Sequence, residues 1–151
     1  MESVSQGAQP KRDLSRLEDY LEVIYNLNEE KGFVSAADIS DRLGVKPPTV
    51  SAMVSRLAKD GYLEHEPYRG MRLTEKGENV ALAVVDRHST IFEFLSLLGV
   101  DKVTAYQDAE GIEHHIQPKT LKGIGLLVRH LRENPDLLKK IKGHARGTKA
   151  A

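Results

Sequence analysis

The segment Glu110-Gly111-Ile112-Glu113-His114-His115 carries the side chains best suited to bind a metal ion. In a helix, Glu110, Glu113 and His114 would lie on one face, because residues three and four positions apart are neighbours. Two carboxylates and an imidazole provide oxygen and nitrogen donors without a thiolate. The spacing therefore predicts half of an oxygen/nitrogen metal site.

The other half of this site is expected from helices upstream. Asp19 and Glu22 lie away from the apolar stripe of the first helix, and His88 lies in the middle of a long helix. Each group taken alone is more typical of a solvated helix face than of a metal site. Together, the carboxylates and imidazoles suffice for two metal ions with bridging carboxylates, whose mutual repulsion a dication would neutralise. The predicted ligands are Asp19, Glu22, His88, Glu110, Glu113 and His114.

The donor set also indicates which metal to expect. Hard oxygen donors with a minority of nitrogen suit Mn²⁺, although affinity order alone would favour Zn²⁺ or Cu²⁺. Cys is absent from the chain, which excludes disulfides and thiolate ligands. Selectivity for Mn²⁺ would therefore depend on coordination number and geometry.

Between the two halves of the metal site lies a predicted helix-turn-helix. Apolar periodicity predicts helices over 15–30, 36–43 and 47–59. Ser35 is a favourable N-cap, Gly44 ends the second helix, and Pro47 is compatible with the first turn of the third. Strands over 61–66 and 71–73 flank a turn at 67–70, so a hairpin wing follows directly.

The exposed face of the third helix predicts DNA binding. It combines small polar side chains, which allow close approach to base edges, with basic residues that reach phosphates. A winged helix that binds protein instead would show the same pattern. The neutral net charge argues weakly against nucleic acid, because a basic patch suffices. The predicted contacts are Lys46, Pro47, Pro48, Thr49, Ser51, Ala52, Ser55, Arg56, Lys59, Arg69 and Arg72, with Lys76 flanking the wing.

The rest of the chain is predicted to be helical. A helix capped by Thr74 should reach about Leu98, and further helices are expected over 104–116, 118–133 and 135–142. Charged residues make up 29% and hydrophobic residues 40% of the chain, which is typical of a folded protein. With no apolar run near the ~18 residues of a membrane span and no signal peptide, we expect a cytoplasmic protein.

The chain resembles the manganese-responsive members of the diphtheria-toxin-repressor (iron-dependent repressor) family over about residues 14–132. In those members the metal ligands match all the ligands predicted above. Iron-responsive members typically have methionine at the position of Asp19 and cysteine at that of Glu110, so the resemblance points to manganese. The matching segments are Glu18–Glu22, Pro47–Val50, Tyr68–Gly70, Arg87–His88 and Asp108–His115.

This resemblance implies a mainly α fold: an N-terminal winged helix-turn-helix with a small β-hairpin wing, followed by an α-helical metal-binding and dimerisation domain. We expect a disordered lead-in over 1–13, the DNA-binding domain over 14–74, the helical domain over 75–142 and a basic tail over 143–151. Apolar surface for dimerisation is expected from Ile91, Phe92, Phe94, Leu95, Leu97 and Leu98, with further cover from the helix over 118–133.

The function implied by the resemblance is that of a manganese-responsive transcriptional repressor rather than an enzyme. A metal-loaded homodimer would bind double-stranded operator DNA and shut off manganese-uptake genes. We expect two Mn²⁺ ions per subunit, with Cd²⁺, Co²⁺, Fe²⁺ or Zn²⁺ as other activating metals. No membrane partner or organic cofactor is expected.

Two other functions use the same features. A winged-helix regulator could respond to another divalent metal or to an organic ligand, although 5% aromatic residues and no tryptophan disfavour a large apolar pocket. A di-metal hydrolase would also use clustered carboxylates and histidines. The chain offers no further catalytic constellation, which disfavours the hydrolase.

Overall fold

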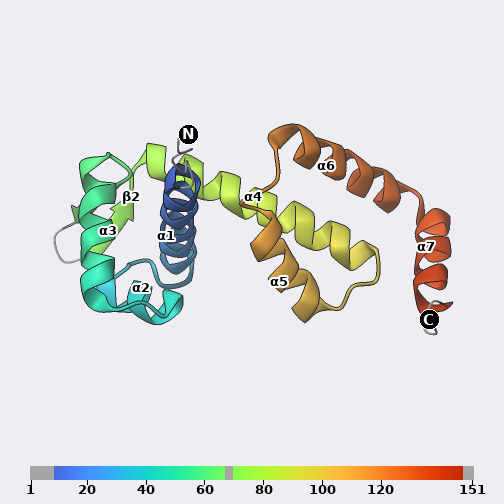
Figure 1. The fold of residues 1–151 in the computed structure, drawn as a ribbon, viewed down its shortest axis with the longest axis horizontal. Helices are drawn as coiled ribbons and strands as arrows, with labels where there is room; N and C mark the ends of the chain where they lie inside the picture. The colour runs from blue at the N-terminus through green and yellow to red at the C-terminus, as the bar shows by residue number, and fades with distance from the viewer. Residues whose placement is uncertain (1–8, 67–69, 148–151) are drawn as a thin grey trace, which may run out of the picture. The chain divides into compact units, whose positions relative to one another are not determined.

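The computed structural model describes residues 9–66 and 70–147. Over these residues the chain is mostly helical, with one two-stranded sheet (Figure 1). It divides into two compact units, Met1–Val84 and Val85–Ala151, so that α4 contributes to both. The elements are α1 (Gln9–Lys31), α2 (Ala36–Leu43), α3 (Pro47–Lys59), β1 (Leu63–Glu66), β2 (Gly70–Leu73), α4 (Glu75–Leu97), α5 (Lys102–Ile112), α6 (Pro118–Glu133) and α7 (Pro135–Gly147).

The predicted helix-turn-helix is confirmed in the first unit. The side chain of Ser35 accepts a hydrogen bond from the Asp38 amide at 3.2 Å, and the Asp38 carboxylate accepts one from the Ser35 amide at 3.0 Å. This capping box fixes the start of α2. Gly44 ends α2 with φ of +63°, a conformation that glycine adopts without strain. Pro47 then begins α3.

The predicted wing is confirmed as the antiparallel pair β1–β2, with Leu63 opposite Leu73 and Glu66 opposite Gly70. β1 begins at Leu63 rather than at the predicted Gly61, because Gly61 has φ of +80° and turns the chain after α3. The amide of Met71 donates to the Val34 carbonyl at 3.0 Å, which joins the hairpin to the segment before α2. The predicted turn residues 67–69 lie outside the described residues.

Apolar side chains from every element of the first unit form its core. Helix α1 contributes a stripe at three- and four-residue spacing, and α3 packs its own stripe against it. The hairpin closes the core with alternate residues, as a half-buried sheet requires. The core residues are Leu17, Tyr20, Leu21, Ile24, Leu27, Val34, Ile39, Val50, Val54, Leu57, Leu63, Met71, Leu73 and Ala81.

In the second unit, α5 is shorter than predicted. Its N-cap, Asp101, accepts a hydrogen bond from the Thr104 amide at 3.0 Å, but the helix ends at Ile112 rather than Ile116. Ala105 and Ala109 are buried, whereas Ile112 is 40% exposed because it lies at the helix end. Ile91, expected on a dimerisation surface, is instead a core residue of this unit.

Both ends of the described chain are more ordered than predicted. The disordered lead-in predicted over 1–13 is wrong for residues 9–13, which form the start of α1; residues 1–8 lie outside the description. Proline at position 10 is compatible with a first helical turn. The predicted end at residue 142 is also wrong, since α7 extends to Gly147 with Leu138 and Ile141 half-buried on one side.

None of the described helices is both long enough and apolar enough to cross a bilayer.

Candidate functional site

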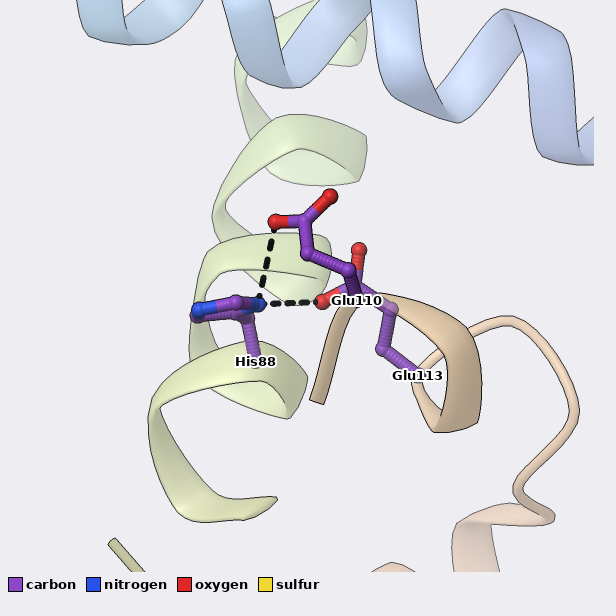
Figure 2. Close-up of side chains that lie close together, drawn as sticks. All are labelled: His88, Glu110 and Glu113. Carbon is purple, nitrogen blue, oxygen red and sulfur yellow. Dashed lines mark hydrogen bonds and ion pairs between the residues drawn. The ribbon is translucent and has the colours of Figure 1, made fainter. Parts of the chain in front are cut away.

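Side chains from α4 and α5 meet at His88 (Figure 2). Its Nδ1 lies 2.8 Å from Oε2 of Glu113 and 3.3 Å from Oε1 of Glu110. Each of these residues offers one ligand atom, and the ligand atoms all lie within 4.8 Å of one another. An imidazole and two carboxylates therefore converge as the sequence predicted.

Glu113 is the buried carboxylate of this cluster, with only 1% of its surface exposed. Burying a carboxylate is costly unless hydrogen bonds or opposite charge compensate for lost hydration. Here Oε2 faces His88, while Oε1 lies 3.3 Å from Nε2 of His114. The carboxylate is thus placed between two imidazoles.

The end of α5 explains how Glu113 reaches this position. Its amide donates to the Ala109 carbonyl at 3.0 Å, and its backbone angles are still right-handed helical. Glu110 and Glu113 therefore keep the i, i+3 relationship of a helix, although regular helix ends one residue earlier. His114 follows in the turn, beside the carboxylate rather than on the helix.

Two aromatic rings fix the position of His88. The ring of Tyr106 meets the imidazole edge-on, with 4.9 Å between ring centroids, and the ring of Phe92 stacks with it at 6.4 Å. The His88 side chain is only 14% exposed. The sequence analysis missed Tyr106, although its position four residues before Glu110 places both on one face of α5.

The chemistry of this cluster fits a divalent cation. Carboxylate oxygens and imidazole nitrogens are the donors that Mn²⁺ and similar metals accept, and a dication would neutralise the clustered carboxylates. The structure brings together His88, Glu110 and Glu113, with His114 beside Glu113. The remaining predicted ligands, Asp19 and Glu22, are half-buried on α1, in the first unit. Their participation stays a prediction.

The outer face of α3 carries the residues predicted to contact DNA. Val50, Val54 and Leu57 point into the core, which leaves the opposite face of the helix to solvent. All predicted contacts on this helix are exposed: Pro47, Pro48, Thr49, Ser51, Ala52, Ser55, Arg56 and Lys59, with Lys46 at the N-cap. Arg69 lies outside the described residues.

Two basic residues near the wing are engaged within the protein. Arg72 lies 3.1 Å from a carboxylate oxygen of Glu66 and 3.8 Å from one of Glu64. The Lys76 amine donates to the Asp60 carbonyl at 2.8 Å and lies 4.2 Å from the centre of the Tyr62 ring. Residue type alone did not show these pairings.

Comparison with known families accounts for both parts of the chain. Residues 14–71 match the N-terminal DNA binding domain of iron dependent repressors, and residues 74–142 match the metal binding and dimerisation domain. The chain belongs to the iron-dependent repressor family. The cluster around His88 lies in the part of the chain that matches the metal binding and dimerisation domain.

Individual relatives agree with the family assignment. This repressor is 45% identical over 125 residues to the HTH-type transcriptional regulator MntR of Lysinibacillus sphaericus (strain C3-41), covering 83% of this chain and 90% of that protein. It is 44% identical over 126 residues to MntR of Listeria monocytogenes serotype 4a (strain HCC23), covering 83% and 89%.

A solved structure shares the fold. A manganese-dependent transcriptional repressor in complex with manganese superposes with a TM-score of 0.68 at 31% identity, covering 74% of this chain and 52% of that one. This chain thus spans about half the length of that solved regulator.

Proposed function

We propose that the protein is a manganese-responsive transcriptional repressor that binds operator DNA as a metal-loaded homodimer and shuts off manganese-uptake genes. The buried Glu113 carboxylate carries this proposal, because it lies between His88 and His114 with Glu110 beside it. The MntR relatives and the manganese-dependent repressor support manganese as the metal. The proposal assigns no catalytic activity.

Ligands from both units would hold the metal: Asp19 and Glu22 from α1 with His88, Glu110, Glu113 and His114. We propose two Mn²⁺ ions per subunit, with Cd²⁺, Co²⁺, Fe²⁺ and Zn²⁺ as other metals to test. When bound, the dications would supply the positive charge that clustered carboxylates require. The Glu113 carboxylate would exchange its imidazole neighbours for metal, and His88 would remain positioned by Tyr106 and Phe92.

The domain containing residues 14–74 would bind DNA through α3. The small exposed side chains of α3 would approach base edges, while Lys46, Lys59, Arg69 and Arg72 would contact phosphates. Each subunit of a dimer would occupy one half-site, and half-sites one helical turn apart are separated by ~34–36 Å. The domain over 75–142 would form the dimer, for which α5 and α6 offer the exposed apolar side chains of Val103, Tyr106, Leu126 and Leu127.

Metal would control DNA binding by restricting the DNA-binding module to orientations that fit the operator. Without metal, repulsion among the carboxylates would allow other orientations. The metal then acts through its higher affinity for the competent state. A coupling free energy of ~1–3 kcal/mol corresponds to roughly 5–150-fold tighter DNA binding.

The experiment that tests this function is fluorescence anisotropy on a labelled promoter fragment of a manganese-uptake gene, at fixed salt. Titration with Mn²⁺ should tighten binding, whereas Mg²⁺ should not, and Zn²⁺ defines selectivity. Equal binding with and without every metal tested would contradict the proposal. Fixed salt is necessary because phosphate contacts make DNA affinity salt-dependent.

A further inference from the structure

The arginine on the exposed face of α3 is held by a carboxylate of α1. Nη1 of Arg56 lies 2.7 Å from Oδ1 of Asp13, and Nη2 lies 2.7 Å from Oδ2. Asp60, four residues along α3, adds a second carboxylate 3.8 Å from Nε. Both side chains of the Asp13–Arg56 pair are about half exposed, at 48% and 47%. The pair therefore lies at the surface that is proposed to meet DNA.

The pairing with Asp13 occupies the groups with which an arginine recognises DNA. Arginine binds guanine or a phosphate through paired N–H donors of its planar fork. In this chain both terminal nitrogens already donate to one carboxylate. The hydrogen bond from Arg56 is also the main cause that lowers the pKa of Asp13, so the carboxylate stays ionised to a lower pH than an ordinary aspartate does. Bidentate DNA binding by Arg56 would require this pair to open.

Asp13 lies outside the part of the chain that matches the family. The matching DNA-binding domain begins at residue 14, whereas α1 begins at Gln9. The first turns of α1 thus reach a residue of the recognition helix 43 positions away in sequence. The pair thus joins a residue that directly precedes the matched domain to one within it.

Resting on the proposed DNA-binding function, we propose that Asp13 lowers the affinity of the protein for DNA by competing with phosphates and base edges for Arg56. A DNA contact of Arg56 must replace an ion pair that is already bidentate, so the free energy of opening the pair is subtracted from binding to either kind of DNA. Asp13 therefore weakens both non-specific and operator binding.

The test uses Asp13→Asn, which keeps the side-chain size but removes the charge. The full-length variant and the wild type are titrated into two labelled duplexes, one of random sequence and one selected by the wild type from a random pool with Mn²⁺. We expect about 2- to 5-fold tighter binding to the random duplex, the range that an exposed ion pair allows. The logarithmic salt slope should steepen by about 0.9, which corresponds to one more phosphate contact. Binding to the selected duplex should tighten as well.

Arg56→Gln and the double variant separate this effect from a general change of charge. In the Arg56→Gln background, Asp13→Asn should no longer tighten non-specific binding. Asp41→Asn, which removes an exposed carboxylate of α2, is the matched single control and should change neither affinity as much as Asp13→Asn does.

Four outcomes would overturn the inference. If Asp13→Asn tightens DNA binding equally in the wild-type and the Arg56→Gln backgrounds, Asp13 acts through its charge alone and not through Arg56. Loss of operator binding alone in Asp13→Asn would mean that Asp13 orients Arg56 for base reading. If the wild type discriminates between the duplexes and Asp13→Asn binds both with the same affinities as the wild type, Asp13 has no role in DNA binding. The proposed function would then remain intact. A wild type that binds neither duplex would refute both.

Discussion

His88 on α4 and Glu113 at the end of α5 are joined by a hydrogen bond of 2.8 Å between Nδ1 and Oε2. This bond holds an imidazole against a carboxylate that is 1% exposed. Metal ligands must be deprotonated, so a metal that binds here displaces any proton shared by the pair. The contact with His88 thus offsets part of the cost of burying the Glu113 carboxylate. The same contact places two metal donors side by side.

Glu113→Gln should abolish the stabilisation of the protein by Mn²⁺. A ligand that binds only the folded state at one hundred times its dissociation constant stabilises it by about 2.7 kcal/mol. The amide keeps the size of Glu113 but lacks the charge that a dication requires. Thermal unfolding with and without Mn²⁺ measures this difference. Glu133→Gln, at the exposed end of α6, is the control and should keep the full response. An unchanged Mn²⁺ response in Glu113→Gln would show that Glu113 is not a ligand.

Asp19→Met should weaken the preference for manganese. A thioether is a softer donor than a carboxylate and suits Mn²⁺ less well than later transition metals. DNA affinity measured with Mn²⁺ and with Fe²⁺ under anaerobic conditions should change in favour of Fe²⁺. If activation stays as specific for Mn²⁺ as in the wild type, Asp19 does not belong to the site.

Gly77→Ala should destabilise the DNA-binding domain. A Cβ at this position would lie 2.0 Å from the Tyr62 carbonyl oxygen, a backbone atom that a side-chain rotation cannot move. We expect a loss of about 3 kcal/mol in the free energy of unfolding, the upper end for overpacking. The measurement is urea unfolding of the metal-free protein.

Gly123→Ala should instead stabilise the protein, which makes it a comparison for Gly77→Ala. A Cβ at this glycine of α6 meets no atom within 4 Å. Alanine favours the helix more than glycine does, so the substitution should raise the free energy of unfolding by about 0.5–1 kcal/mol. Equal effects of the two substitutions would contradict the close approach of α4 to Tyr62.

Asp38→Asn should destabilise the protein at neutral pH but not in strong acid. The Lys31 amine, and then Ser35, hold the pKa of Asp38 well below its usual range. A carboxylate with a lowered pKa stabilises the fold above its unfolded pKa of about 3.9. That contribution is lost as the pH falls from there through the folded pKa.

Urea midpoints of the wild type and Asp38→Asn at a series of pH values check this direction. The gap between them should be constant near neutrality and should shrink below about pH 3.9. A gap that grows in acid would have the wrong sign.

The regular elements could be predicted because local signals mark their ends. Ser35 and Gly44 fix α2, Pro47 begins α3, and Pro118 begins α6, all as predicted. The end of α5 could not be predicted, since it depends on the tertiary contacts of Glu113 with His88. The periodicity of apolar residues would have extended the helix to Ile116.

The candidate site could be predicted in composition but not in its pairings. Spacing three residues apart was enough to place Glu110 and Glu113 on one side of α5. The pairs Asp13–Arg56 and Glu66–Arg72 depend on which elements fold together, which residue types do not encode. Arg56 and Arg72 therefore looked available for DNA, although both contact carboxylates.

Isothermal titration of Mn²⁺ into the protein, with and without operator duplex, measures directly whether metal binding and DNA binding are coupled. Linkage requires that DNA tighten metal binding by the same factor by which metal tightens DNA binding. If metal controls DNA binding, we expect roughly 5–150-fold tighter Mn²⁺ binding in the presence of the duplex, and no such change in Glu113→Gln. Identical Mn²⁺ affinity with and without the duplex would contradict metal control of DNA binding.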